Sequence, residues 1–347
     1  MKLLIVTQAV DREDPNLGAF YYWFEELARQ CERVVILAAR AGDQALPPNT
    51  EIHTFAAATR PGRLWKFWEL FSRDFVQSDA VLFHMIPEFV LAASPFLIAR
   101  RRPSALWYAH KSVTPALKIA ERLVRYVFTS SADGFRIPSK KVLWLGQAIN
   151  TEFFVPSRDS TSARAGLRMI SVGRIAPVKN YEVLLDAAAL MKNDSRPWSL
   201  DIVGGPMLSR DREYLVALQR RAAETGLAER VRFLGPRHYS EIPSLLNQHD
   251  IFINLSSTGS LDKAVLEAMS CGLTVITANE AYRSILPPRY FLQDPDPASL
   301  VSRIRECAGE TRPNETLRRI VEEHHGLDKT MEKIIAVLSA PNSQHNA

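Results

Sequence analysis

Residues 251–278 read I-F-I-N-L-S-S-T-G-S-L-D-K-A-V-L-E-A-M-S-C-G-L-T-V-I-T-A and decide the fold of the second half of the chain. The pattern predicts an apolar strand, a polar loop with Gly259, a helix with Glu267, a stop at Gly272 and a second apolar strand. The loop would present backbone amides and the positive end of a helix beside a carboxylate. This suits a ligand with an anionic group and hydroxyls, such as a nucleotide-sugar. An ordinary strand–helix–strand unit would give the same pattern.

A second segment upstream favours the binding interpretation. From Met169 the chain reads M-I-S-V-G-R-I-A-P-V-K-N-Y-E-V-L-L-D-A-A-A-L-M, with a strand that ends at Gly173 and a helix that begins near Asn180. Arg174 and Lys179 lie in the loop between them, where two cations and unpaired helix-start amides could bind a diphosphate. Either cation alone would be an ordinary surface charge. However, open α/β sheets bind ligands at the carboxyl ends of their strands.

Length and composition restrict the class of protein. The 347 residues fit two domains of ordinary size, and 46% apolar and 23% charged residues are typical of a globular protein. The net charge of +5 is compatible with nucleic acid, an anionic membrane or phosphorylated substrates and does not distinguish them. Cys31, Cys271 and Cys307 give neither a disulfide framework nor metal-ligand spacing, so we expect a reducing cytoplasm. No stretch reaches the roughly 20 apolar residues of a membrane span.

Strands and helices alternate twice along the chain, which predicts α/β domains with parallel sheets. In the first half, strands are expected at 3–7, 34–39, 52–56, 80–85, 105–109, 126–129 and 142–145, with helices at 20–30 and 88–100. In the second half, strands are expected at 169–172, 200–203, 231–234, 251–254, 273–277 and 290–292. The small polar segment 156–166 is interpreted as a linker between domains at 1–155 and 167–341, and 342–347 as a tail.

Four motifs in the second domain resemble a known family. V-G-R-x-x-x-x-K at 172–179, L-x-I-V-G-G-P at 200–206, V-x-F-L-G at 231–235 and L-E-A-M-S-C-G-L-x-V-I at 266–276 follow in the order seen in family-four glycosyltransferases with the GT-B fold. The first domain is similar to that family at H-M-I-P-E (84–88), Y-A-H-K (108–111) and G-Q-A-I-N-T-E-F-F (146–154).

The resemblance implies retaining transfer from a nucleotide-sugar in a central cleft faced by the parallel sheets of two Rossmann-like domains. It implies no metal and no cofactor, because Arg174 and Lys179, with Gly173 before them, would neutralise the departing diphosphate. Glu267 resembles the residue that binds the nucleotide ribose. His110 resembles the family histidine near the donor sugar and its β-phosphate; the alternative is a histidine satisfied in the core or at the cleft edge.

One motif departs from the family pattern. The family has two glutamates in E-x(7)-E, and the first position is Gly259 here. Either Asp262 replaces that carboxylate, or the amides of Gly259, Ser260 and Leu261 contact the donor. T-G-S-x-D-K resembles a variant of related bacterial enzymes, so activity is still expected. Asp262 and Lys263 could instead be a charge pair with only a capping role at the helix start.

Two features of the first domain have open interpretations. Gly18 follows the first strand, and the resemblance implies backbone approach to the donor phosphate or the acceptor there; the alternative is a plain turn glycine. Residues 60–73 read R-P-G-R-L-W-K-F-W-E-L-F-S-R, in which aromatic and basic residues share a helix. This helix would face the acceptor or an anionic membrane, or Leu64, Trp68 and Phe71 are core contacts.

The sequence therefore predicts a metal-independent, retaining glycosyltransferase with a UDP- or GDP-sugar as donor. The expected acceptor is a glycan or a lipid-linked intermediate in surface polysaccharide biosynthesis. We expect a cytoplasmic protein, either free or peripheral at the inner face of the membrane, with no nucleic-acid partner. The alternatives are a nucleotide-sugar epimerase of the same fold and a non-catalytic binding module.

Overall fold

A computed structural model describes residues 1–14, 17–157 and 166–340. Most of the expected linker at 156–166 and the whole tail at 342–347 lie outside the described residues. By contacts the chain divides into a first unit of Met1–Ala148 with the described part of Gly326–Ala347, and a second unit of Ile149–His325. The last helix therefore groups with the first unit, whereas the expected second domain, 167–341, included it.

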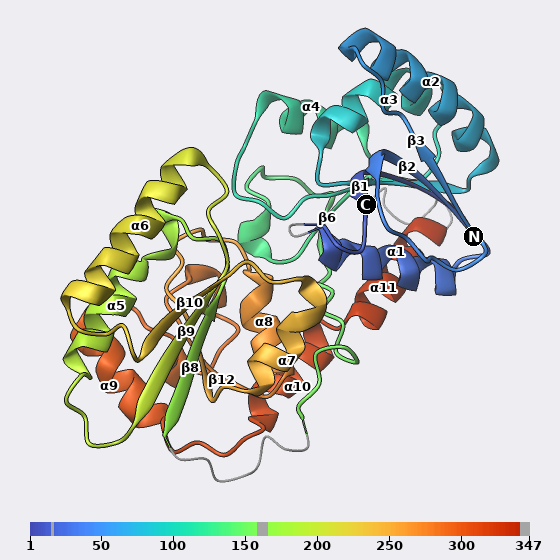
Figure 1. Cartoon of the computed structure of the whole chain (residues 1–347). Coiled ribbons are helices and arrows are strands. Elements are labelled where there is room, and N and C mark those ends of the chain that lie inside the picture. Colours follow the sequence, from blue (N-terminus) through green and yellow to red (C-terminus); the bar gives the residue numbers. More distant parts are fainter. Residues whose placement is uncertain (15–16, 158–165, 341–347) are drawn as a thin grey trace. The chain divides into compact units, whose positions relative to one another are not determined.

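The first unit contains a seven-stranded parallel sheet in the order β3-β2-β1-β4-β5-β6-β7. Its strands are β1 (Lys2–Val10), β2 (Arg33–Ala41), β3 (Thr50–Thr54), β4 (Ala80–His84), β5 (Ser104–Trp107), β6 (Tyr126–Thr129) and β7 (Val142–Trp144). The helices in this unit are α1 (Gly18–Gln30), α2 (Arg60–Gln77), α3 (Pro87–Ala99), α4 (Pro115–Leu123) and α11 (Leu327–Ser339) (Figure 1). All strands that the sequence predicted in this half are present within a few residues.

The helix α11 packs beside α1 although the two are at opposite ends of the chain (Figure 1). Its apolar residues Met331, Ile334 and Leu338 are buried, at the spacing of one helix face. Thr330 is also buried, and its hydroxyl donates to the carbonyl of Leu145 at 3.2 Å. These contacts tie the C-terminal helix to the end of the first unit's sheet.

The helix α2 covers the sheet with an aromatic stripe. Phe67, Phe71 and Phe75 are buried at a four-residue spacing. The ring centroids of Phe67 and Phe71 are 5.3 Å apart, and those of Phe71 and Phe75 are 5.1 Å apart. Trp68 is partly buried, and its indole donates to the carbonyl of Ala92 at 2.7 Å. The expectation of a core contact is confirmed for Phe71 and wrong for Leu64, which is 40% exposed because the buried stripe begins one turn later.

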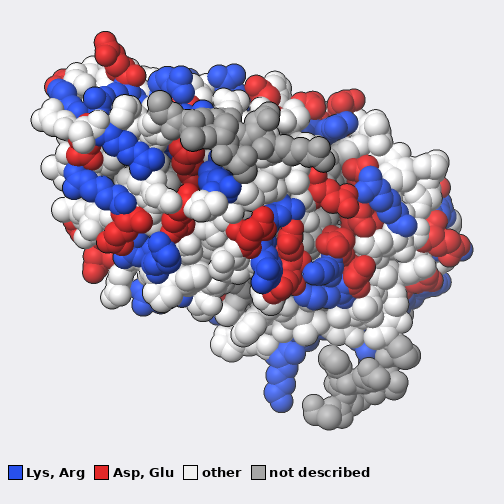
Figure 2. Space-filling view, turned by 90° about the horizontal axis from the view of Figure 1, so that it is seen from below, with Lys and Arg blue, Asp and Glu red and all other residues white. Residues whose placement is uncertain are grey.

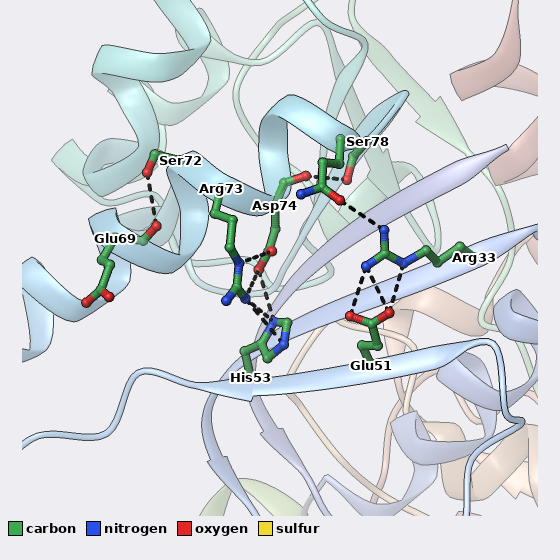
Figure 3. A network of polar contacts seen from close by, with 9 residues as sticks. Arg33, Glu51, His53, Glu69, Ser72, Arg73, Asp74 and Ser78 are labelled. Carbon is green, nitrogen blue, oxygen red and sulfur yellow. Dashed lines mark hydrogen bonds and ion pairs between the residues drawn. The ribbon is translucent and has the colours of Figure 1, made fainter.

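A polar network ties α2 to the sheet edge (Figure 3). The buried Asp74 carboxylate lies 3.0 Å from Nδ1 of His53 on β3 and accepts from Arg73 at 2.8 Å. On the neighbouring strand, Arg33 pairs with Glu51 of β3 at 2.8 Å. These contacts span β2, β3 and α2, so they hold the edge strand in register.

The second unit contains a five-stranded parallel sheet in the order β10-β9-β8-β11-β12. Its strands are β8 (Leu167–Val172), β9 (Trp198–Val203), β10 (Val231–Gly235), β11 (Ile251–Asn254) and β12 (Thr274–Thr277). The helices are α5 (Tyr181–Leu190), α6 (Ser209–Glu224), α7 (Ile242–Asn247), α8 (Lys263–Ser270), α9 (Pro297–Cys307) and α10 (Glu315–His324). Counted from β8 as the first strand of this unit, the order is 3-2-1-4-5. It places β8 and β11 side by side, so the loops that follow them lie at the same edge of the sheet.

The last predicted strand, 290–292, is wrong. A 3-10 turn η6 (Pro288–Tyr290) occupies this position, and Phe291 makes only an isolated bridge to Thr277. The backbone amides of Tyr290 and Phe291 donate to the carbonyls of Pro287 and Pro288 within this turn, so they do not form a regular ladder with β12.

Charges of both signs are interspersed on the face shown in Figure 2 and do not form one large field. Cys31, Cys271 and Cys307 are free and buried. Among the helices that the structure describes, none is both long and apolar enough to cross a membrane.

Candidate functional site

The connection from β8 to α5 presents a lysine at the carboxyl end of the sheet. After β8 the chain passes Gly173 and forms a short 3-10 turn, η3 (Pro177–Lys179), before Asn180 adopts a left-handed conformation with φ of 53°. A Cβ placed on Gly173 would lie 3.9 Å from Nζ of Lys179, so the lysine ammonium lies directly over the glycine backbone. The sequence prediction of a strand end, a cationic loop and a helix start is confirmed here.

Lys179 is held by an ion pair with Asp262. The Lys179 ammonium lies 2.8 Å from Oδ2 of Asp262, and both side chains are mostly buried, with 13% and 17% exposed. The amide of Asn254 also donates to Oδ2 of Asp262, at 3.0 Å. Asp262 is the N-cap residue of α8 but makes no side-chain capping hydrogen bond there, and its carboxylate instead pairs with Lys179.

Two hydrogen bonds join the loop after β11 to the loop after β8. The amide side chain of Asn180 donates to the carbonyl of Leu255 at 2.8 Å, and the backbone amide of Ser257 donates to the carbonyl of Val178 at 3.0 Å. Gly259 has φ of 64°, a left-handed conformation that a glutamate would adopt only with strain. The glycine at the first position of the two-glutamate pattern therefore fits the backbone conformation of this loop better than a glutamate would.

Ser260 and Leu261, which follow Gly259 in this loop, hold the loop against the rest of the second unit. Ser260 accepts a hydrogen bond at its carbonyl from the side-chain amide of Asn279, at 2.8 Å. Leu261 is 4% exposed and belongs to the hydrophobic core of the second unit. The loop is thus anchored at both positions.

Glu267 is a buried carboxylate one turn into α8. It is 4% exposed, and its Oε1 accepts from the hydroxyl of Tyr239 at 2.9 Å. Burial raises the pKa of Glu267 to about 7, while the Tyr239 hydrogen bond and the charge of Lys263 oppose this shift. Burial lowers the pKa of Lys263 to about 7, and the Glu267 charge opposes that shift. A buried acid and a half-buried base therefore lie four residues apart on one helix.

Arg174 differs from Lys179 in being exposed. Its guanidinium approaches only the sulfur of Met207, at 3.7 Å, among its side-chain contacts to the described residues. An exposed guanidinium without a carboxylate partner at a strand end can bind an anionic group at little desolvation cost.

His110 and Gly18 belong to the first unit. His110 lies in the loop after β5 and is exposed, so it is not a core histidine. Its Nδ1 accepts from the backbone amide of Ser112 at 3.1 Å. Gly18 is the first residue of α1, and its amide donates to the carbonyl of Asp14 at 2.9 Å. It has no positive φ, so it is a helix-start residue and not a turn glycine.

Within the second unit, the structure brings together the residues predicted after β8 and β11. Three further residues support them and were not predicted: Asn254, which binds Asp262; Tyr239, which binds Glu267; and Tyr282, whose hydroxyl donates to the Asp262 carbonyl at 2.7 Å. Asn254 could have been noticed because it ends an apolar strand. The two tyrosines lie in unpatterned segments, which gave no signal. In the described residues, no three His, Cys, Asp or Glu side chains gather in a way that could hold a metal ion.

Comparison with known proteins identifies the class. Residues 158–322 match the family model described as Glycosyl transferases group 1. The match covers most of the second unit, Ile149–His325, and confirms the resemblance seen in the four motifs. The fold is GT-B: the structure of Anabaena Alr3699/HepE in complex with UDP has a TM-score of 0.78 at 17% identity, covering 98% of this chain and 100% of that chain.

Two relatives are similar mainly in part of their length. The D-inositol 3-phosphate glycosyltransferase of Jonesia denitrificans is 29% identical over 163 residues, 45% of this chain and 38% of the relative. The GDP-mannose:cellobiosyl-diphosphopolyprenol alpha-mannosyltransferase of Komagataeibacter xylinus is 26% identical over 183 residues, 52% of this chain and 44% of the relative. The chain thus aligns to less than half the length of each of these two relatives.

Proposed function

We propose that this protein is a glycosyltransferase that moves a sugar from a nucleotide-sugar to a glycan or lipid-linked acceptor, with retention of configuration and without a metal. The observation that carries the proposal is the mostly buried Lys179–Asp262 ion pair at the carboxyl edge of a glycosyltransferase group 1 domain. The names of similar proteins, with UDP in one and GDP-mannose in another, support a nucleotide-sugar donor.

The residues have distinct proposed roles. Arg174 and Lys179 bind the diphosphate, and the backbone at Gly173 leaves room for it beside the lysine. Glu267 accepts hydrogen bonds from the ribose hydroxyls. The loop of Gly259, Ser260, Leu261, Asp262 and Lys263 lies next to the transferring sugar. His110 and Gly18 contribute from the first unit to the sugar and phosphate.

In the proposed reaction, the bond between the sugar C1 and the diphosphate oxygen breaks, and the electron pair leaves with the diphosphate. A bond forms between C1 and an acceptor oxygen on the same face, and the acceptor hydroxyl gives its proton to the departing diphosphate oxygen. Charge therefore develops on the departing oxygen, where preorganised cations contribute most to the rate. Because the Asp262 carboxylate fixes the position of the Lys179 ammonium, little reorganisation is needed during the reaction.

Incubation with labelled donors tests this proposal against its alternatives. The protein is mixed with UDP- and GDP-sugars, with and without glycan and polyprenyl-diphosphate acceptors. A glycosyltransferase gives a labelled product only with an acceptor. Isomerised donor without acceptor would instead identify an epimerase, and tight binding without either product would identify a binding module. Nuclear magnetic resonance of the anomeric proton in the product tests retention.

Peripheral contact with the inner face of a membrane is also proposed, through the start of α2. Trp65 is 71% exposed and Leu64 40% exposed, and Arg60 and Arg63 beside them are exposed. An exposed tryptophan flanked by cations suits an anionic lipid surface. Co-sedimentation with vesicles containing phosphatidylglycerol should weaken for Trp65→Ala. The matched control is Val216→Ala, which removes another exposed apolar side chain, 64% exposed on α6. Equal binding by both variants would refute the contact.

A further inference from the structure

A basic cavity lies in the first unit, away from the sheet edge that carries His110 and Gly18. It has a volume of about 560 Å³ and is lined by Arg101, Arg102, Arg125, Lys140 and Lys141, with Leu97, Ser104, Leu123, Val124, Tyr126 and Leu143. Ser104 begins β5, Tyr126 begins β6 and Lys141 precedes β7. The cavity is therefore at the amino ends of these strands, whereas His110 and Gly18 follow carboxyl ends. Its volume falls within the ~300–1,000 Å³ range of small-molecule pockets.

Two of the cations are fixed by structural contacts. The Lys141 ammonium donates to the carbonyls of Glu121, Arg122 and Val124 at the end of α4, at 2.8, 3.1 and 3.0 Å. Arg102 donates to the carbonyls of Ser78 and Val76 at the end of α2. These contacts offset part of each charge through the negative ends of the two helices. They also keep both side chains on the cavity wall.

Arg101 and Lys140 have no such contacts among the described residues. Arg101 and Lys140 are exposed, and neither makes an ion pair or side-chain hydrogen bond with any residue that the structure describes. Arg125 lies over the ring of Tyr126, 5.3 Å from its centroid, which orients its guanidinium. The described lining residues include no Asp or Glu; Glu121, 4.0 Å from Lys141, is the nearby carboxylate, and it accepts from Ser139 at 2.6 Å.

We propose that this cavity binds a phosphorylated ligand, with its phosphate held by Arg101, Arg125 and Lys140 and its apolar part on Leu97, Leu123 and Leu143. Like charges that converge on one concave surface repel one another and raise the local potential for anions. Arginine guanidinium groups bind phosphate oxygens bidentately, and lysine adds a point charge. The apolar floor distinguishes the site from a solvated charge cluster, because it can take the organic part of the ligand.

Hydrogen exchange with inorganic pyrophosphate tests the proposal. The Arg174→Ala/Lys179→Ala variant is used, so that the proposed donor site does not contribute and the result is independent of the glycosyltransferase assignment. Pyrophosphate should slow exchange in peptides covering residues 97–104 and 139–143. Adding Arg101→Gln/Lys140→Gln should raise the pyrophosphate concentration needed for half-maximal protection by ~10-fold or more. The matched control is Arg220→Gln/Lys333→Gln, two exposed cations elsewhere on the chain, which should leave the protection unchanged.

A second arm distinguishes a free phosphate compound from a lipid headgroup. Phosphatidylcholine vesicles with and without phosphatidic acid are sedimented with the unmodified protein and with Arg101→Gln/Lys140→Gln. If pyrophosphate gives no protection but phosphatidic acid recruits the protein and the double variant loses recruitment, the ligand is a lipid phosphate. No protection together with no variant-dependent recruitment overturns the proposal. If Arg220→Gln/Lys333→Gln loses as much protection or recruitment as Arg101→Gln/Lys140→Gln, the proposal is also overturned, because the effect would then come from net charge.

Discussion

Lys179→Ala should remove most of the proposed catalytic activity. In the structure the Lys179 ammonium is 2.8 Å from Asp262, and its side chain is 13% exposed, so water cannot readily replace it. The substitution deletes a positive charge and leaves the Asp262 carboxylate with the Asn254 amide as its side-chain partner. Loss of one preorganised donor to a developing anion costs about 3–4 kcal/mol, or roughly 100–1,000-fold in kcat.

The assay is single-turnover transfer from a labelled nucleotide-sugar, with the melting temperature measured alongside. Lys192→Ala is the matched control, because Lys192 is an exposed lysine of the same unit whose ammonium contacts only the carbonyl of Thr225 at 3.1 Å among its described polar contacts. Lys192→Ala should keep the wild-type rate. Lys179→Arg should fall between the two, since it keeps the charge but changes the geometry.

Asp262→Asn separates catalysis from simple folding support. This substitution breaks the ion pair but keeps the Lys179 charge, so it should melt like Lys179→Ala and turn over faster. A near wild-type rate for Lys179→Ala would refute the reasoning. Equal loss of rate in Lys179→Ala and Asp262→Asn would also refute it, because the ion pair and not the cation would then be what matters.

Three further predictions concern the same site. Glu267→Gln and Glu267→Ala should weaken binding of the nucleoside diphosphate by about 1.5–3 kcal/mol in calorimetric titration, whereas Tyr239→Phe should weaken it less; unchanged affinity in both Glu267 variants would leave that residue structural. Transfer activity should survive a chelator such as EDTA, and loss that magnesium or manganese restores would contradict the metal-independent proposal. Burial lowers the pKa of Lys263 to about 7, and a bound diphosphate would raise that pKa, so binding should take up a proton and affinity should fall as pH rises above about 7. Binding heats should then depend on the buffer in wild type and depend on it less in Lys263→Met, in which the Glu267 carboxylate can still take up a proton. Buffer-independent wild-type heats would contradict the prediction.

The sequence predicted local elements well because their signals are local. Strands such as β4 and β11 are short apolar runs that are buried throughout, and the structure places them where expected. The failure at 290–292 has the same origin, since an apolar triplet looked like a strand while two of its three backbone amides donate inside a 3-10 turn. On α2 the predicted core stripe began at Leu64, whereas the buried stripe begins one turn later at Phe67. Several apolar residues lie near this face, so the sequence pattern did not fix its start.

Contacts between distant segments could be predicted only in part. Lys179 and Asp262 are 83 residues apart, and nothing in either segment states that β8 and β11 are neighbours. Each residue was selected from its position after a strand, but their ion pair depends on strand order. The support of Glu267 by Tyr239 depends on the path of a third loop, whose sequence carries no pattern.

The return of α11 to the first unit has a consequence for synthesis on the ribosome. The second unit, Ile149–His325, is one continuous stretch and can complete its contacts as soon as it emerges. The first unit emerges earlier but lacks the apolar face of Met331, Ile334 and Leu338 until α11 has been synthesised. Its α1 surface stays uncovered during that interval, so a premature stop before Gly326 would release a chain whose first half, and not its last, is the part left incomplete.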